Sequence, residues 1–421
     1  MFVGLAAASP TFQPPLFDLE HRVIIKPRPG LSNKAVQATG VQVQDLRSKP
    51  PAAAGTLASG VDPLLLRHLE PGASMEQTLL ELNSSDDVEW AVEDHIILPA
   101  RVPNDPLYQK QWAMQRVGAE AAWDFSVGGL LPPAGKVRQP PPAAPPPPSS
   151  SASRNSSKIV VCIIDSGVDY QHPQLASTMA AGWGWNALDP SQPPMDVLGH
   201  GTHVAGVIAA ATNDRGQVAG LTWGPAAGSA VSLLACKFMT DQGFGYTSGA
   251  VACFDYCLAS GADVISASWS AGTAPNLLLE EAVGKAEAAG VLVVVAAGNQ
   301  GFNLAEIATY PAAYGLNHPL VLTVGASGVQ DEWVEYASWD AVAVHISAPG
   351  TTILSTWPGG FVEYSSGTSM AVPFVSGAAA LLLAASGRRM SALQVKQVLL
   401  ETAEQLETHQ GRCSSGVGGA L

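Results

Sequence analysis

Apolar residues in the second half of the chain form short continuous runs, separated by helix-like stretches. The continuous runs, which predict buried strands, lie at residues 158–164, 231–238, 263–267, 291–296 and 320–324. The helix-like stretches lie at residues 203–211, 247–259, 276–289 and 369–385. Apolar strands that alternate with helices are typical of a parallel sheet. We therefore predict an α/β domain whose mainly parallel sheet has helices on both faces.

The first hundred residues have a different pattern. Residues 21–26 and 88–98 are predicted to be strands, and residues 64–82 are predicted to be helical with a break near Pro71-Gly72. This order predicts a small α+β unit over residues 20–102, after a leader or unstructured segment over residues 1–19. The larger domain would then span residues 103–421.

Residues 128–157 form a Pro- and Ser-rich tract within the larger domain. Such a composition buries little apolar surface and is typical of an extended surface segment. We therefore interpret the tract as an insertion that comes before the first core strand and leaves the scaffold intact.

Composition excludes several function classes. The chain has 421 residues, of which 47% are hydrophobic and 13% are charged, so it has enough apolar material for a large core. A net charge of −14 argues against nucleic acid and anionic membrane surfaces as partners. The chain has no unbroken run of 18 apolar residues, so we expect no membrane partner.

The five cysteines form no Cys-x-x-Cys pair and no zinc-like cluster. Cys162 and Cys236 lie in apolar runs, and we interpret them as buried, inert thiols. Cys253 and Cys257 lie four residues apart on a predicted helix, where a metal half-site is possible but ordinary thiols are favoured. On this interpretation, the cysteines do not settle the redox compartment.

Polar residues occur where predicted strands end or helices begin. Asp165 ends the first run, His203 and Ser369 open two helices, and Asn299 ends the run VLVVVAAGN. Ligands of parallel sheets bind beyond the carboxyl ends of the strands. Each of these residues alone is typical of a cap, a turn or a packed side chain. Together, Asp, His and Ser can activate a serine hydroxyl, because the imidazole takes its proton and the carboxylate orients the imidazole.

The motifs around these residues resemble those of the subtilisin family of serine proteases. The matching stretches are Ile164-Asp165-Ser166-Gly167-Val168, residues 200–206 (HGTHVAG) and residues 367–373 (GTSMAVP), with Ala297-Gly298-Asn299 between the last two. The order Asp, His, Ser is that of subtilisin. The resemblance covers residues 103–421 and implies a subtilisin-like fold and a serine endopeptidase.

The resemblance also implies roles for individual residues. Asp165 would orient the base, His203 would be the base and acid, Ser369 the nucleophile, and Asn299 the side-chain oxyanion donor. His200 is interpreted as a loop residue that supports the turn before His203. The walls of the substrate pocket would be formed by Ser268, Trp269 and Ser270 and, opposite them, by Ala296, Ala297 and Gly298. Protein or peptide substrates would bind in extended form.

Residues 20–100 resemble, more weakly, the inhibitory propeptide that precedes many subtilases. The resemblance implies a zymogen that cuts itself near residues 100–104, with its own propeptide as intramolecular inhibitor. Secretion is expected, although residues 1–10 lack the basic start of a signal peptide.

No cofactor is expected for the chemistry, but a structural calcium ion is possible. Relatives that bind calcium often carry Asp where this chain has Gln174 after His172-Pro173, which puts one site in doubt. Asp105 and Asn213 are weak candidates for oxygen ligands.

Two other function classes compete with the protease interpretation. A binding protein on the same scaffold is motivated by the insertion and the altered metal loop, but every catalytic position has a competent residue. A nucleotide-binding protein is excluded, because no GxGxxG or Walker A motif follows the first strand.

Overall fold

The computed structural model describes residues 22–27, 43–45, 65–69, 74–93, 102–129, 158–414 and 419–420. The chain divides into two compact units, which are described separately: described residues up to 93 belong to the smaller unit and those from 102 onward to the larger one. The leader at 1–19 and residues 130–157 of the predicted insertion lie outside the described residues.

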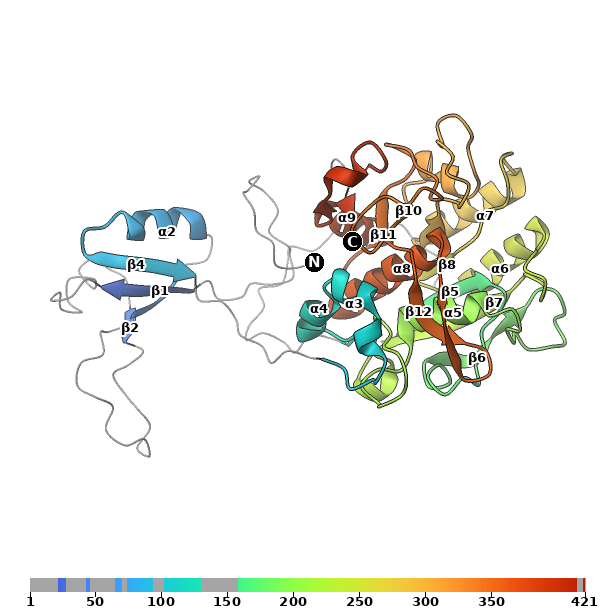
Figure 1. Cartoon of the computed structure of the whole chain (residues 1–421), viewed down its shortest axis with the longest axis horizontal. Coiled ribbons are helices and arrows are strands. Elements are labelled where there is room, and N and C mark those ends of the chain that lie inside the picture. The colour runs from blue at the N-terminus through green and yellow to red at the C-terminus, as the bar shows by residue number, and fades with distance from the viewer. Residues whose placement is uncertain are drawn as a thin grey trace. The chain divides into compact units, whose positions relative to one another are not determined.

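In the smaller unit, the described residues form an antiparallel sheet and a helix, α2 (Figure 1). Its strands, in the order β2-β3-β1-β4, are β1 (Arg22–Pro27), β2 (Val43–Asp45), β3 (Leu65–His68) and β4 (Val88–Glu93). Helix α2 (Met75–Asn83) begins where the Ser74 hydroxyl accepts a hydrogen bond from the Gln77 amide. Its apolar side packs on a small core that includes Val23, Ile25 and Val88.

The prediction of a helix beginning at residue 64 is wrong for its first turn. Residues 65–68 pair with β1 as a strand, with Leu66 opposite Ile24. The break expected near Pro71-Gly72 leaves too few residues before it for a helix, so this short apolar run adds to the sheet instead.

Seven long parallel strands form the centre of the larger unit, in the order β11-β10-β9-β8-β5-β7-β6. Their bounds are β5 (Ile159–Asp165), β6 (Met179–Asn186), β7 (Val231–Lys237), β8 (Val264–Ala267), β9 (Leu292–Ala296), β10 (Val321–Ser327) and β11 (Ile346–Pro349). The five predicted strands are confirmed as β5, β7, β8, β9 and β10. Strand β6 was missed because it is an edge strand rich in Gly and Ala, and at Gly184 the carbonyl oxygen of Ala235 leaves no space for a side chain.

Helices cover both faces of this sheet, as predicted (Figure 1). One face packs against α5 (His200–Ala209), α8 (Thr368–Ala385) and α9 (Ala392–Glu401), and the other against α6 (Thr247–Ala259) and α7 (Leu277–Ala288). Alternate residues of β5 show this division, because Val161 and Ile163 face α5 and α8 whereas Cys162 and Ile164 face α6. Among the described helices, α8 is long and apolar enough to cross a membrane, but 83% of it is buried inside the unit as a core helix.

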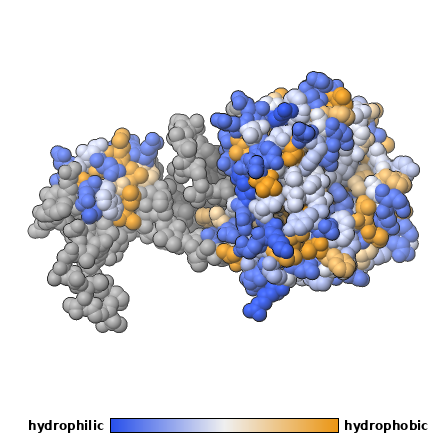
Figure 2. All heavy atoms as spheres, in the orientation of Figure 1, coloured by the Kyte–Doolittle hydropathy of each residue, from blue (hydrophilic) through white to orange (hydrophobic). Residues whose placement is uncertain are grey.

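Shorter elements complete the larger unit. They are the helices α3 (Trp112–Arg116) and α4 (Ala119–Phe125), the hairpin strands β12 (Ile353–Trp357) and β13 (Phe361–Ser365), the edge strands β14 (Glu404–Gln405) and β15 (Gly419–Ala420), and the 3-10 turns η1 (Tyr108–Lys110), η2 (Pro225–Ala227), η3 (Ala312–Leu316) and η4 (Glu407–His409). Figure 2 shows that apolar side chains on the visible face of this unit form small, separated patches among hydrophilic ones. The apolar residues are thus concentrated in the core.

Two disulfides correct the interpretation of the cysteines as thiols. Cys162 of β5 is bonded to Cys257, and Cys236 of β7 is bonded to Cys253. The Cα–Cα distances are 5.9 and 5.6 Å, within the usual range for a disulfide. Because β5 and β7 are neighbours and α6 lies over them, the two cysteines on one face of α6 each reach one strand. Helix α6 is therefore attached covalently to the sheet.

Candidate active site

The candidate site lies at the carboxyl ends of the parallel strands. Asp165 is the last residue of β5, and Asn299 follows shortly after β9. His200 is the first residue of α5, and Ser369 is the second residue of α8. Parallel strands bring these termini to one edge of the sheet, so residues 204 positions apart meet there.

Asp165 contacts His200. The carboxylate Oδ1 of Asp165 lies 2.7 Å from Nδ1 of His200, and it also accepts a 2.7 Å hydrogen bond from the Ser166 amide. Asp165 is fully buried, whereas 27% of the His200 side chain is exposed. Burial acts to lower the pKa of His200, but the charge and the hydrogen bond of Asp165 outweigh it and raise this pKa above its usual 6.5. His200 is thus anchored on one side and open to the pocket on the other.

The prediction that His203 pairs with Asp165 is wrong. His203 lies one turn further along α5, has no exposed surface, and its Nε2 lies 2.9 Å from the carbonyl oxygen of Ile353 in β12. Its Nδ1 is buried without a hydrogen-bond partner among the described residues. Burial lowers the pKa of His203 to about 4. The structure therefore brings His200, and not His203, to Asp165.

The start of α5 explains this difference. The helix begins at His200, and not at His203 as predicted, because Asp196 accepts hydrogen bonds from the Gly199 and Thr202 amides and caps the first turn. The first residue of a helix at the sheet edge remains accessible, whereas a residue one turn inside is covered. A usable signal was present in the sequence, because Gly199 directly before His200 is a typical helix boundary.

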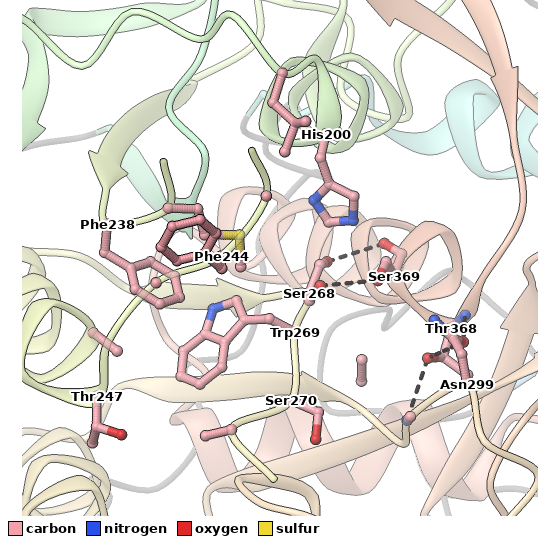
Figure 3. A pocket seen from close by; sticks show the side chains of 18 of the residues that line it. His200, Phe238, Phe244, Thr247, Ser268, Trp269, Ser270, Asn299, Thr368 and Ser369 are labelled. Carbon is pink, nitrogen blue, oxygen red and sulfur yellow. Dashed lines mark hydrogen bonds between the residues drawn. The ribbon is translucent and has the colours of Figure 1, made fainter. Parts of the chain in front are cut away.

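Ser369 lines the same pocket as His200 (Figure 3). Its hydroxyl donates a 2.9 Å hydrogen bond to the carbonyl oxygen of Ser268, and the Ser268 hydroxyl donates a 3.0 Å bond to the carbonyl oxygen of Ser369. This reciprocal pair fixes the start of α8 against the end of β8. In unliganded enzymes a catalytic hydrogen bond often forms only when substrate binds, so the Ser268 partner does not exclude a nucleophilic role for Ser369.

Asn299 presents its amide nitrogen to the same pocket. Its Oδ1 accepts hydrogen bonds of 2.8 and 2.9 Å from the amide and the hydroxyl of Thr368 (Figure 3). These two bonds fix the orientation of the carboxamide, so that Nδ2 remains as the available donor. A side chain at Gly367 would lie 3.2 Å from this Nδ2, so the close approach favours glycine there.

The pocket between these residues has a volume of about 440 Å³. Ser268, Trp269, Ser270 and Gly298 line it, as the resemblance implied, together with apolar side chains from Leu198, Phe238, Phe244 and Tyr246. Ala296 also lines it, but Ala297 does not, because this residue is fully buried in a separate apolar cluster.

The two candidate metal ligands, Asp105 and Asn213, lie side by side but make different hydrogen bonds. Asp105 is 4% exposed, and its Oδ2 accepts a 2.7 Å hydrogen bond from the Asn213 amide. The side-chain oxygen of Asn213 accepts a hydrogen bond from the Asn104 amide. Asp105 Oδ1 is buried with no hydrogen-bond partner among the described residues, and burial followed by the neighbouring Asp214 raises the pKa of Asp105. Asp105 and Asp214 thus offer carboxylate oxygens of the kind that an oxygen-binding cation takes as ligands.

Gln174 occupies the position that put a calcium site in doubt. Its carboxamide donates to the carbonyl oxygens of Ala211 and Val218 and accepts from the Val218 amide, at 2.7 to 3.1 Å. The neutral Gln174 side chain therefore holds the two ends of the segment 211–218 together through hydrogen bonds. In the part of the chain that the structure describes, no three His, Cys, Asp or Glu side chains are grouped as a metal site.

Comparisons with known proteins agree with this geometry. Residues 156–418, more than half of the chain, match the model of the subtilase family. The chain is 33% identical over 305 residues to thermitase of Thermoactinomyces vulgaris, covering 72% of this chain and 92% of thermitase. It is 32% identical over 334 residues to a thermophilic serine proteinase of Bacillus sp. (strain AK1), covering 79% of this chain and 72% of that protein.

The fold is also similar to a solved structure. A cold-adapted subtilisin-like serine proteinase matches with a TM-score of 0.53 and 28% sequence identity, over 66% of this chain and 93% of that one. The parallel sheet, the residues assembled at its edge and the family match lead to one conclusion: the chain belongs to the subtilase family and is a serine endopeptidase.

Proposed function

We propose that Asp165, His200 and Ser369 carry out the endopeptidase reaction as a catalytic triad. One observation carries this assignment: His200 is hydrogen-bonded to the buried Asp165 and lines the same pocket as Ser369. The assignment keeps Asp165 and Ser369 from the sequence prediction and replaces His203 with His200.

The reaction begins when the Ser369 hydroxyl attacks the carbonyl carbon of the scissile peptide bond. His200 Nε2 takes the hydroxyl proton, and Asp165 stabilises the imidazolium that forms. Asn299 Nδ2 and the Ser369 amide, in the first turn of α8 where amides lack helical acceptors, donate to the oxyanion. When the intermediate collapses, His200 protonates the leaving amine. Water then attacks the acyl group with His200 again as base, and Ser369 is released.

The acid limb of the pH profile would report His200. Only the neutral imidazole can accept the serine proton, and the Asp165 contact raises the pKa of His200 above 6.5. We expect activity to increase as the pH rises through this pKa, and the enzyme to be most active on the alkaline side of it.

Protein or peptide substrates would bind as extended segments along the pocket. Ser268, Trp269 and Ser270 follow β8 and Gly298 follows β9, so the two walls offer backbone groups to a third strand between them. Leu198, Phe238 and Phe244 line the same pocket and would contact apolar side chains of the substrate.

The smaller unit would act as a propeptide and intramolecular inhibitor that the enzyme removes itself. Its strands and α2 have their own core. In contrast, Asn104 exchanges hydrogen bonds with Asn213 and Arg215, so the chain from this point belongs to the larger unit. A cut near residues 100–104 would release the smaller unit and leave the new N-terminus attached.

Intact mass after parallel expression of the wild type and Ser369→Ala tests the proposal. We expect the wild type to lose about a hundred N-terminal residues and Ser369→Ala to remain uncut and inactive on a peptide substrate. Cleavage of folded Ser369→Ala at an equal rate would contradict the nucleophile assignment. An active wild type that is never cut would contradict self-processing alone.

We also propose that the protein is secreted. The Cys162–Cys257 and Cys236–Cys253 disulfides support this, because structural disulfides form and persist in oxidising compartments. A structural calcium ion would take Asp105 Oδ1 and the Asp214 carboxylate as ligands. It would neutralise two adjacent carboxylates there and take no part in the reaction.

A further inference from the structure

We propose that Lys237 is a positioning residue for the triad, which holds the Asp165 carboxylate in place through Ser166. The inference rests on the proposed triad and adds a residue outside the motifs of the sequence analysis.

Lys237 is a buried cation at the end of β7. Only 8% of its side chain is exposed, and its ammonium donates a 2.7 Å hydrogen bond to the carbonyl oxygen of Ser166. Its other contact is a 3.1 Å ion pair with Asp241, which is about half exposed. Removing an ammonium from water costs free energy, and the exposed Asp241 offsets little of it. The fixed Ser166 carbonyl is therefore the principal partner of this charge.

Ser166 is held at three atoms. Its carbonyl oxygen accepts from Lys237, its hydroxyl oxygen accepts a 2.9 Å bond from the Gly201 amide, and its own amide donates to Asp165 Oδ1. Gly201 is in the first turn of α5, directly after His200. Ser166 thus connects β7, α5 and the Asp165 carboxylate.

The Ser166 amide is the backbone donor that orients Asp165. Oδ1 accepts from both Ser166 and His200, while Oδ2 is buried with no hydrogen-bond partner among the described residues. The carboxylate therefore depends on one oxygen for both contacts. Loss of the Lys237 bond would free the Ser166–Gly167 peptide. The Ser166 amide belongs to the preceding peptide unit, so the effect would reach it through the Ser166 backbone, and the Oδ1 direction towards His200 would become less defined.

Charge adds a second effect of Lys237. The titratable groups around His200 are Asp165 of β5, Asp196 before α5, His203 of α5 and, behind Ser166, Lys237 of β7. Three elements thus bring charged groups to this site, and Lys237 is the lysine among them. A nearby cation disfavours imidazolium, so its removal should make His200 easier to protonate.

The test compares Lys237→Met, Lys237→Arg and Asp241→Asn with the wild type. Each is measured for kcat and KM on a chromogenic peptide, for the pH profile of kcat/KM, for thermal unfolding and for the fraction of active sites. We expect Lys237→Met to lower kcat per active site by about tenfold or more, to leave KM nearly unchanged, and to move the acid limb to higher pH. Lys237→Arg should restore the acid limb, and Asp241→Asn should match the wild type.

Two outcomes would overturn the inference. One is a folded Lys237→Met with the wild-type kcat and acid limb. The other is an activity loss that only follows the loss of active sites, which would mean that Lys237 is structural. Activity in Ser369→Ala would instead contradict the triad itself, so the two failures are distinguishable.

Discussion

The imidazole Nδ1 of His200 lies 2.7 Å from the carboxylate Oδ1 of Asp165, although 34 residues lie between them in the chain. This contact fixes which ring nitrogen faces the carboxylate and leaves Nε2 directed to the pocket of Ser369. His203 shares the helix but contacts β12 instead. Under the proposed triad, His200 therefore has the chemical role in this motif and His203 a structural one.

Separate substitutions of His200 and His203 should have opposite effects on turnover and stability. We expect His200→Ala to fold normally and to lose nearly all turnover, since removing the corresponding base in subtilisin lowers kcat by about 10⁶-fold. His203→Gln, which keeps a donor for the Ile353 carbonyl, should retain turnover and lose stability. Active-site titration and thermal unfolding of both variants check this. An active His200→Ala would restore His203 as the candidate base.

Acid should destabilise the protein through His203. Its pKa is about 4 in the folded state and about 6.5 when unfolded. Between these values the unfolded chain binds a proton that the folded protein does not, so stability is complete above pH 6.5 and falls as the pH approaches 4. Protonation of His203 would lower the free energy of unfolding by about 3 kcal/mol.

Urea unfolding at several pH values measures this loss. The Ser369→Ala background prevents self-digestion, and the same background with His203→Gln is the matched control that lacks the group. We expect the pH dependence of the free energy of unfolding to be weaker in the control. Parallel curves for the two proteins would show that His203 titrates normally in the folded state.

The amide of Asn299 should contribute to turnover and not to substrate binding. Asn299→Asp keeps an oxygen for the two Thr368 bonds and removes the Nδ2 donor. Loss of the corresponding donor in subtilisin lowers kcat by about 10²–10³-fold, and the added negative charge should make the loss here at least as large. Steady-state kinetics should show a changed kcat with a nearly constant KM. A fall in kcat/KM that comes from KM alone would place Asn299 in substrate binding.

The two disulfides should differ in their contribution to stability. Cys162–Cys257 spans 95 residues and Cys236–Cys253 spans 17, and a longer loop constrains the unfolded chain more. Paired Cys→Ala substitutions should therefore cost about 4–5 kcal/mol for the first bond and about 3 kcal/mol for the second. Chemical unfolding in the Ser369→Ala background measures both. Four titratable thiols at these positions in the native protein would contradict the bonds.

Calcium should stabilise the protein through Asp105. The orphaned Oδ1 and the nearby Asp214 carboxylate repel each other, and a divalent cation would relieve that repulsion. In the Ser369→Ala background, calcium should raise the unfolding temperature and a chelator should reverse it. Asp105→Asn should remove the response, whereas Asp255→Asn on the exposed side of α6 should keep it. An unchanged response in Asp105→Asn would place the ion elsewhere.

The sequence alone determined the main architecture and predicted three of the four residues of the proposed site. Near-continuous apolar runs predicted five of the central strands, since a strand buried on both faces must be apolar throughout. Asp165, Asn299 and Ser369 were recognisable because each follows a strand or begins a helix within a specific motif. These signals are local, so they could be read without knowing which strands are neighbours.

Only the tertiary structure decided which histidine faces Asp165 and which cysteines pair. His200 and His203 are both polar residues at a helix start, and the choice depends on where the Asp196 cap begins α5 and on β12, about 150 residues away, covering His203. The disulfides likewise depend on α6 lying across β5 and β7. These contacts arise from sheet order and helix packing, which join residues distant in the chain and leave no periodic signal near either partner.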